Sequence, residues 1–258
     1  MLQQKLQQAT GGQIVSKHTI TRILKTVHIR SRKMATRTLL LPHHRLKRLQ
    51  WAQQHVNWTD VQWSNVLNTD EVRICLRHTD GRRRVWRGSN ERYEDFAVQS
   101  ISQAGGGSVM FWAGICSDGK TDLIQVNGNM TSLRYIAEIL TPHVLPFAGA
   151  IGNEFILQDD NARPHRGHVV DTFLDEEGIE RLDWPAYSAD ISPIENLWSD
   201  LKKQVYLQVN NTTTLRELPD IARRVWTLIP IEKIRNLMRS MRRRCNAVIR
   251  ARGGYIRY

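Results

Sequence analysis

From residue 60 onward, short apolar runs alternate with stretches of helical periodicity, and this order constrains the fold more than any other feature of the chain. The runs predict strands at residues 65–69, 72–76, 109–113, 123–126, 155–158 and 179–182. The periodic stretches predict helices at 133–140, 165–177, 194–205, 215–228 and 231–251. A group of strands followed by alternating helices and strands predicts an α/β domain on a mixed sheet.

Length and composition limit the class of protein. The chain has 258 residues, of which 41% are hydrophobic, enough for one sizeable core with a small additional module. No apolar run approaches the ~20 residues needed to cross a bilayer, and the N-terminus lacks the apolar core of a signal peptide. Cys75, Cys116 and Cys245 lie far apart, so we expect neither a disulfide framework nor a cysteine zinc site.

Charge is distributed unevenly along the chain. Residues 1–59 hold 11 Lys and Arg and no acid, whereas residues 60–200 carry a net charge of −10 and residues 201–258 a net charge of +11. Two basic ends predict binding of a polyanion, and the acidic centre suggests metal-binding carboxylates. Charge alone is equally compatible with a basic nuclear or ribosomal protein that has no catalytic activity.

The first 30 residues have a helix-turn-helix pattern. A short helix around Leu2 and Leu6 ends at Gly11-Gly12, and Ser16 can cap a second helix over residues 16–27. Apolar Ile20, Ile23, Leu24 and Val27 share one face of that helix. The opposite face carries the candidate DNA-binding residues Lys17, His18, Thr21, Arg22 and Lys25. A small helical hairpin without DNA contacts has a similar pattern.

Residues 31–59 are expected to form a basic linker and a helix. Arg30, Arg32 and Lys33 begin a stretch with little periodicity, which could follow a phosphate backbone or remain a solvated linker. A helix is expected from His43 to Val56, with Leu46, Leu49, Ala52 and Val56 on its apolar side.

Three acids lie where strands or helices begin or end, and they are the candidate catalytic and metal-binding residues. Asp70 is expected to follow a strand, Asp160 follows another, and Glu195 falls in the first turn of a helix. Carboxylate oxygens bind Mg²⁺, and a pair of such ions supports phosphodiester chemistry. Each acid also has a simpler explanation: a surface charge, turn chemistry, or a capping box formed by Ser192, Pro193 and Glu195.

Several ordered motifs carry a resemblance to a known family. They are Thr69-Asp70-Glu71, Gly81-Arg82 with Val85-Trp86-Arg87, Gly105–Met110, Gln158–His165, Trp184-Pro185-Ala186 and Asp190–Trp198. This series closely resembles the Tc-type branch of the Tc/mariner transposases, including the spacing of 34 residues between Asp160 and Glu195. The resemblance extends over essentially the whole chain, to the terminal Arg252-Gly253-Gly254.

The resemblance implies an RNase H-like catalytic domain at residues 60–258 that performs cut-and-paste DNA transposition. It implies Mg²⁺ or Mn²⁺, two ions, held by Asp70, Asp160 and Glu195, with His165 arranging the site. Residues 1–30 match only the second of the family's two helix-turn-helix units, so an N-terminally truncated copy is expected. The third acid's surroundings depart from the family pattern at Ala189 and Ser192, and Asn68 stands where the family strand is apolar.

The implied partners are double-stranded DNA, as terminal inverted repeats and a TA-containing target, and a second copy of the chain. Nuclear residence would follow from the substrate, and no membrane is involved. Two alternatives remain open at this point: a catalytically silent or domesticated DNA-binding derivative, and an RNase H-like nuclease that cleaves RNA–DNA hybrids without joining strands.

The C-terminal helix expected at 231–251 has two faces. Ile234, Leu237, Met238, Met241, Cys245 and Val248 form an apolar stripe that should pack on the catalytic domain. The arginines lie largely off this stripe, and neutralising Arg242, Arg243 and Arg244 together should weaken DNA binding if that face contacts phosphates. A solvated surface is the alternative.

Overall fold

The computed structural model describes residues 16–26, 38–77 and 106–257, and it divides into two compact units, Met1–Leu39 and Leu40–Tyr258. The expected helix around Leu2, the linker residues Arg30, Arg32 and Lys33, and the motif at 81–87 lie outside the described residues. None of the helices in the described parts combines the length and apolarity that crossing a bilayer requires.

In the N-terminal unit, one described helix, α2 (Lys17–Thr26), matches the predicted second helix of the helix-turn-helix pattern. Ser16 caps it as expected, since its hydroxyl oxygen accepts the Thr19 backbone N–H at 3.1 Å. Four of the predicted DNA-binding side chains are exposed: His18, Thr21, Arg22 and Lys25. The side chains of Lys17, Ile20, Ile23 and Leu24, and all of Val27, lie outside the description.

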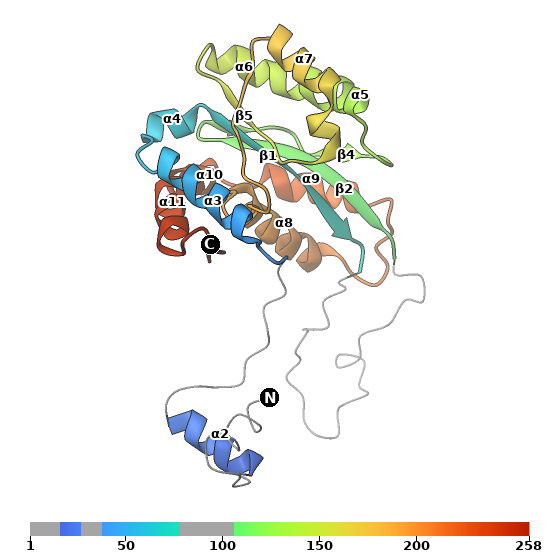
Figure 1. Ribbon diagram of the computed structural model, residues 1–258. Coiled ribbons are helices and arrows are strands. Elements are labelled where there is room, and N and C mark those ends of the chain that lie inside the picture. The colour runs from blue at the N-terminus through green and yellow to red at the C-terminus, as the bar shows by residue number, and fades with distance from the viewer. Residues whose placement is uncertain (1–15, 27–37, 78–105, 258) are drawn as a thin grey trace. The chain divides into compact units, whose positions relative to one another are not determined.

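The second unit is built on a mixed sheet, as predicted (Figure 1). Its strands are β1 (Val66–Cys75), β2 (Ser108–Cys116), β3 (Gly119–Lys120), β4 (Ile124–Val126), β5 (Ile156–Gln158) and β6 (Glu180–Arg181). The order is β3-β2-β1-β5-β6, and β4 also pairs with β2. The pairs β1–β2, β2–β3 and β2–β4 are antiparallel, whereas β5 lies parallel to both β1 and β6.

The two strands predicted at 65–69 and 72–76 are one continuous strand, so the prediction that Asp70 follows a strand is wrong. Asp70 pairs with Ala113 and Glu71 with Trp112 in the middle of the β1–β2 ladder. Charged side chains do not interrupt a ladder, because the main chain makes its hydrogen bonds whatever side chain it carries. Asp70 is therefore held by strand hydrogen bonds on both sides of it along the chain.

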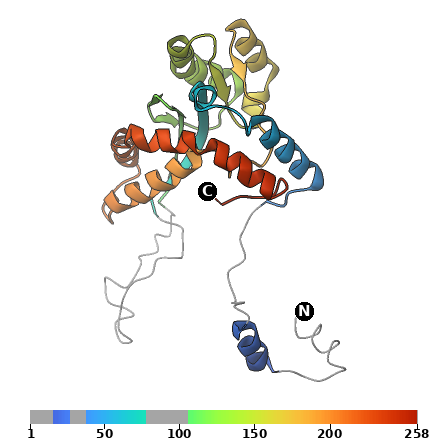
Figure 2. The same cartoon turned by 90° about the vertical axis from the view of Figure 1, so that its left-hand side faces the viewer.

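Helices cover both faces of the sheet (Figures 1 and 2). On one face, α8 (Ile194–Gln208), α9 (Leu218–Thr227) and α10 (Ile231–Arg239) pack on Phe111, Ala113 and Ile115 of β2. On the other face, Trp112 and Cys116 contact the helices that follow β4. The alternation along β2 follows from the two-residue period of a strand, and it gives the unit two cores.

The helical stretch expected at 133–140 is longer and less regular than predicted. It comprises α5 (Ser132–Tyr135), a π-helix (η1, Ile136–Val144) and α6 (Leu145–Ile151). Pro142 lies inside the π-helix and has no N–H to donate, which removes one α-helical hydrogen bond. The helix expected at 165–177 likewise separates into a 3₁₀ turn, η2 (Arg163–Arg166), and α7 (His168–Glu176).

A third core joins the start of the unit to its end. Helix α3 (Pro42–His55) packs against α11 (Met241–Arg250). Trp51 of α3, Trp63 of the short helix α4 (Asp60–Ser64) and Trp184 belong to this core. The predicted apolar side of α3 is partly wrong, because Leu46 is 55% exposed while Arg48 is fully buried.

The helix predicted at 231–251 is broken at Ser240 into α10 and α11. The Ser240 hydroxyl donates to the Leu237 carbonyl and accepts from Arg244 Nε, so the side chain stabilises the break. The predicted stripe is buried at five positions: Ile234, Met238, Met241, Cys245 and Val248. Arg242 and Arg243 are exposed, but Arg244 is 1% exposed, so its prediction as a DNA-facing residue is wrong.

Candidate active site

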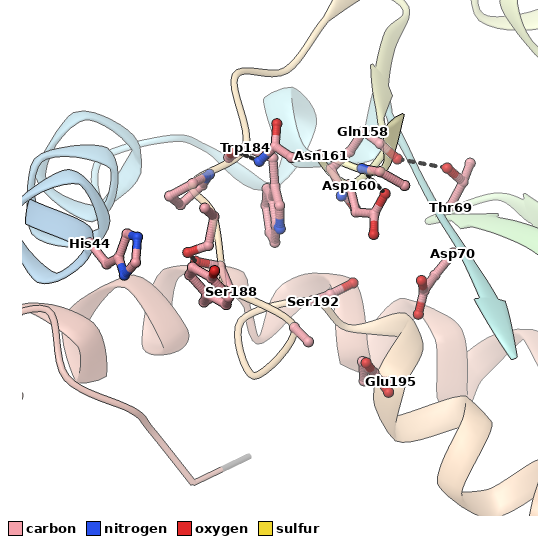
Figure 3. A pocket seen from close by; sticks show the side chains of 15 residues that line it. His44, Thr69, Asp70, Gln158, Asp160, Asn161, Trp184, Ser188, Ser192 and Glu195 are labelled. Atoms are coloured by element: carbon pink, nitrogen blue, oxygen red, sulfur yellow. Dashed lines mark hydrogen bonds between the residues drawn. The ribbon is translucent and has the colours of Figure 1, made fainter. Parts of the chain in front are cut away.

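One pocket of about 570 Å³ brings together the three acids singled out in the sequence. Asp70 comes from β1, Asp160 from the loop after β5, and Glu195 from the first turn of α8. Their side chains point into the same cavity (Figure 3). Strand β1 pairs in parallel with β5, so Asp70 lies near the loop that carries Asp160. Helix α8, which carries Glu195, packs against β1.

The fold opposes the ionisation of Asp70. Burial, the charge of Glu195 and the charge of Glu71 together raise the pKa of Asp70 to about 8. The indole Nε1–H of Trp198 donates to Asp70 Oδ2 at 3.0 Å and partly offsets this effect. Trp198 lies on α8, one turn after Glu195, so the same helix presents one acid and orients another.

Asp160 lies in the opposite electrostatic environment. Burial acts to raise its pKa, but the nearby His165 imidazole and the Ala162 N–H, at 2.8 Å from Asp160 Oδ1, lower the pKa below the usual value. Its side chain is 51% exposed, so it reaches the open side of the pocket. The backbone N–H and the imidazole fix the direction in which the carboxylate faces.

His165 bridges two acids. Its Nδ1 lies 3.0 Å from Asp160 Oδ1, and its Nε2 lies 3.2 Å from Glu71 Oε1. Burial lowers the pKa of His165, but the interactions with Asp160 and Glu71 outweigh it and raise the pKa to about 10. The imidazole is therefore protonated at neutral pH and forms ion pairs with both carboxylates. The arranging role that the sequence resemblance implied for His165 stays a prediction.

Asp159 is separated from the pocket, although it precedes Asp160 in the chain. Its side chain is fully buried, 2.8 Å from Arg166 Nη1 and 3.7 Å from Arg181 Nε. The Tyr135 hydroxyl donates to it at 3.4 Å. Asp159 is thus committed to an internal ion-pair network.

The predicted capping box at Glu195 is not formed. Helix α8 begins at Ile194 with Pro193 at its N-cap, and Pro193 makes no side-chain capping bond. Within the described part of the chain, the buried Ser192 Oγ has no hydrogen-bond partner. Pro193 already has helical backbone angles, so what the box lacks is the hydrogen bond to the Ser192 hydroxyl. Glu195 lines the pocket from the first turn of α8.

The rest of the pocket wall comes from the loop between β6 and α8, together with His44 of α3. Tyr187 in this loop is 49% exposed, and its φ of 57° lies in the left-handed region that non-glycine residues rarely adopt. Its ring lies 4.5 Å from that of His44, centroid to centroid. Backbone strain of this kind persists only where the surroundings impose it, and here it borders the acids.

The acids suit a hard divalent cation by their chemistry. All three donors are carboxylates, and the raised pKa of Asp70 reflects burial first and then repulsion by Glu195 and Glu71, which a cation would relieve. Across the described residues, no three His, Cys, Asp or Glu side chains are already close enough to form a metal-binding group. The chemistry of the three donors, rather than their present spacing, is what fits Mg²⁺ or Mn²⁺.

Comparison with known families agrees with this fold and this pocket. Residues 65–216 match the family described as "DDE superfamily endonuclease", and residues 1–57 match a helix-turn-helix family described as "Transposase". The chain therefore belongs to the DDE superfamily endonucleases. Within that superfamily it is a DNA transposase of the Tc type, as its relatives indicate.

These relatives match nearly the whole chain. The Tcb1 transposase of Caenorhabditis briggsae is 31% identical, over 95% of this chain and 89% of that protein. The Tc3 transposase of Caenorhabditis elegans is 32% identical, over 94% of this chain and 72% of that protein.

Among solved structures, the Mos1 mariner paired-end complex with Mn has a TM-score of 0.77 at 14% identity. The match covers 100% of this chain and 76% of that one. The predicted RNase H-like α/β fold is thereby confirmed.

Two site residues were not singled out from the sequence. Trp198 is the last residue of the Asp190–Trp198 motif. Its position one helical turn after Glu195 could have indicated that it lies beside the acids. Nothing in the sequence indicated that Arg48 is buried, because a basic residue on a helix is ordinarily solvated. Only the tertiary structure shows its burial.

Proposed function

We propose that this transposase hydrolyses phosphodiester bonds at transposon ends and transfers the freed 3′-hydroxyl ends into target DNA. The supporting observation is the convergence of Asp70, Asp160 and Glu195 in one pocket from segments far apart in the sequence. The pocket opens to solvent along the exposed side of Asp160, where a DNA strand could enter.

Asp70, Asp160 and Glu195 would hold two Mg²⁺ or Mn²⁺ ions. Such ions, when bound, activate a water or hydroxyl nucleophile and stabilise the leaving oxygen. Trp198 orients Asp70, while His165 and the Ala162 N–H orient Asp160. The protein's own contribution is thus to fix the carboxylates and to admit the scissile phosphate between them.

The DNA partners would be the terminal inverted repeats and a TA-containing target. Contact with the repeats is supported by four exposed side chains on α2: His18, Thr21, Arg22 and Lys25. The sequence adds four more basic residues in this region, Lys17, Arg30, Arg32 and Lys33. The fold is shared with Mos1 complexes described as paired-end and strand transfer complexes. We therefore propose action as a homodimer that joins two ends, in the nucleus.

A strand-cleavage assay tests the proposal. Duplex DNA carrying the element's flanking repeats is incubated with the full chain, with and without Mg²⁺ or Mn²⁺. Metal-dependent nicking at the repeat end, followed by joining to a TA target, is expected. Asp160→Asn should abolish both steps without loss of DNA binding, whereas Asp175→Asn, an exposed acid on α7, should leave them unchanged.

Two other results of the strand-cleavage assay would contradict the proposal, and each would indicate a different function. Binding without cleavage in the wild-type chain would indicate a silent DNA-binding derivative. Cleavage of RNA–DNA hybrids without strand joining would indicate a hybrid nuclease instead.

A further inference from the structure

We propose that two buried arginines, Arg48 and Arg244, are positioning residues that hold the loop before α8 so that Glu195 reaches the metal. The inference rests on the proposed function, because it assigns Glu195 a metal-binding role. The two arginines come from α3 and α11, which lie side by side. We call residues 187–196, the loop together with the first turn of α8, the Glu195 loop. Arg48 contacts its first half and Arg244 its second half.

Arg48 holds the first half of the Glu195 loop. Its guanidinium is fully buried and forms a two-pronged pair with Asp190, at 2.7 Å from Oδ1 and 2.8 Å from Oδ2. It also donates to the Tyr187 carbonyl and to Ser188 Oγ, both at 2.9 Å. The Tyr187 carbonyl belongs to the residue with the left-handed backbone, so Arg48 stabilises the strained turn directly.

The C-terminal turn completes the surroundings of Arg48. Its Nε donates to the Gly253 carbonyl at 3.0 Å, and Nη2 donates to the Gly254 carbonyl at 3.1 Å. With these bonds all five N–H groups of the guanidinium point at acceptors. The Ile256 backbone N–H also donates to Asp190 Oδ2 at 2.8 Å. The end of the chain is therefore part of the support for the Glu195 loop.

Arg244 holds the second half. Its Nη2 donates to Asn196 Oδ1 at 2.6 Å, and Nη1 lies 3.4 Å from both the Ile191 and the Ser192 carbonyls. Nε donates to Ser240 Oγ at the break between α10 and α11. Asn196 directly follows Glu195, so Arg244 contacts the loop on both sides of the acid.

Because the charges of Arg48 and Arg244 are buried, each side chain depends on its hydrogen-bond partners. Removing one partner leaves an uncompensated charge, and a lysine cannot reproduce the planar fork. Mutation of a residue that orients a metal ligand without touching the metal typically lowers metal affinity by about 10–100-fold. The contacts of Arg48 and Arg244 given above are with the Glu195 loop and the segments around it, so we expect their effect on metal binding to act through the position of Glu195.

Mn²⁺ binding by the full chain without DNA tests this, measured from the electron paramagnetic resonance signal of free Mn²⁺. The variants are Arg48→Lys and Arg244→Lys. The matched controls are Arg45→Lys and Arg243→Lys, exposed neighbours on the same two helices. We expect affinity to fall by about tenfold or more in the two buried variants and to stay at the wild-type value in the controls.

A structural control separates positioning from general destabilisation. Val144→Ala removes buried volume in the core on the opposite face of the sheet, away from the Glu195 loop. It should lower thermal stability without changing Mn²⁺ affinity. Equal losses of affinity in Val144→Ala and in the arginine variants would overturn the inference, and so would unchanged affinity in folded Arg48→Lys and Arg244→Lys.

Milder variants keep the test decisive if a lysine variant does not fold. Asn196→Ala and Ser188→Ala each remove a single acceptor and should weaken Mn²⁺ binding a few-fold, with faster amide exchange over residues 187–196. No change in either quantity would contradict the inference. A wild-type chain that binds no Mn²⁺ would instead overturn the proposed function itself.

Discussion

Trp198 donates its indole N–H to Asp70 at 3.0 Å, and this bond links the helix that carries Glu195 to the strand that carries Asp70. The ring also lies in the core beneath the sheet, stacked on Trp226 with centroids 5.4 Å apart. One side chain therefore sets the distance between two acids and anchors both to the same core. The pocket is rigid on this side for a packing reason as well as a polar one.

Replacing Trp198 by Phe should preserve most of the packing and remove the hydrogen bond to Asp70. We expect a loss of about 1–3 kcal/mol in the free energy of unfolding, measured by urea denaturation. Mn²⁺ affinity should fall as well, because Asp70 loses its fixed orientation. Trp226→Phe is the matched control, since its indole donates to the Thr121 carbonyl away from the acids. It should lose similar stability and retain the affinity; a matching fall in Mn²⁺ binding would contradict the assignment.

Asp70→Asn should stabilise the metal-free protein at alkaline pH. The pKa of Asp70 rises from 3.8 to about 8, so between these values the folded state binds more protons than the unfolded state. Stability contributed by this group therefore falls as pH rises through that window. The variant keeps an acceptor for Trp198, and its advantage over wild type should be about 1 kcal/mol or more at pH 8 and vanish near pH 4. Urea denaturation in EDTA at both values checks this, and an equal difference at the two pH values would refute it.

The neighbouring aspartates should respond in opposite ways. Asp159→Asn leaves Arg166 and Arg181 without their buried partner and should cost about 2–4 kcal/mol of stability. Asp160→Asn alters a half-exposed side chain and should change stability by about 1 kcal/mol at most, while cleavage is lost. Urea denaturation and the strand-cleavage assay together separate the two roles. A stable, inactive Asp159→Asn protein would reverse the assignment.

The exposed arginines of α11 give a revised test of DNA contact. Neutralising Arg242 and Arg243 together, with Arg244 intact, should reduce the salt slope of DNA binding by about 0.9 for each arginine that meets a phosphate. The fold should be unaffected, because both side chains are exposed. Binding titrations from low to high salt measure the slope. A wild-type slope would identify this face as a solvated surface.

Gly253→Ala should be far more damaging than an alanine at another left-handed glycine. Gly253 has φ +74°, and a Cβ there would clash with the Arg45 carbonyl oxygen. Gly128 has φ +66° but open space around it, so Gly128→Ala should cost only about 1–2 kcal/mol for the backbone conformation. We expect Gly253→Ala to exceed this by several-fold in urea denaturation. Similar costs at the two positions would show that the C-terminal turn moves freely.

Local pattern in the sequence determined much of this protein. Two-residue and helical periodicities located most strands and helices, and Ser16 predicted the start of α2 correctly. The acids Asp70, Asp160 and Glu195 were found from their positions and from the motifs around them. These features depend on residues close together in the chain, and propensity, periodicity and capping act over that range.

The tertiary structure decided what depends on partners distant in sequence. Pairing with β2 carries β1 through Asp70, where the side chains alone suggested a strand end. Arg48 and Arg244 are buried only because acceptors up to about 200 residues away surround them, so their basic character predicted solvent or DNA instead. Ser192 has the residue pattern of a cap, but its buried hydroxyl makes no hydrogen bond in the described part of the fold. A buried charge or an interrupted helix is stable only with its partners in place, and those partners are brought together by the fold.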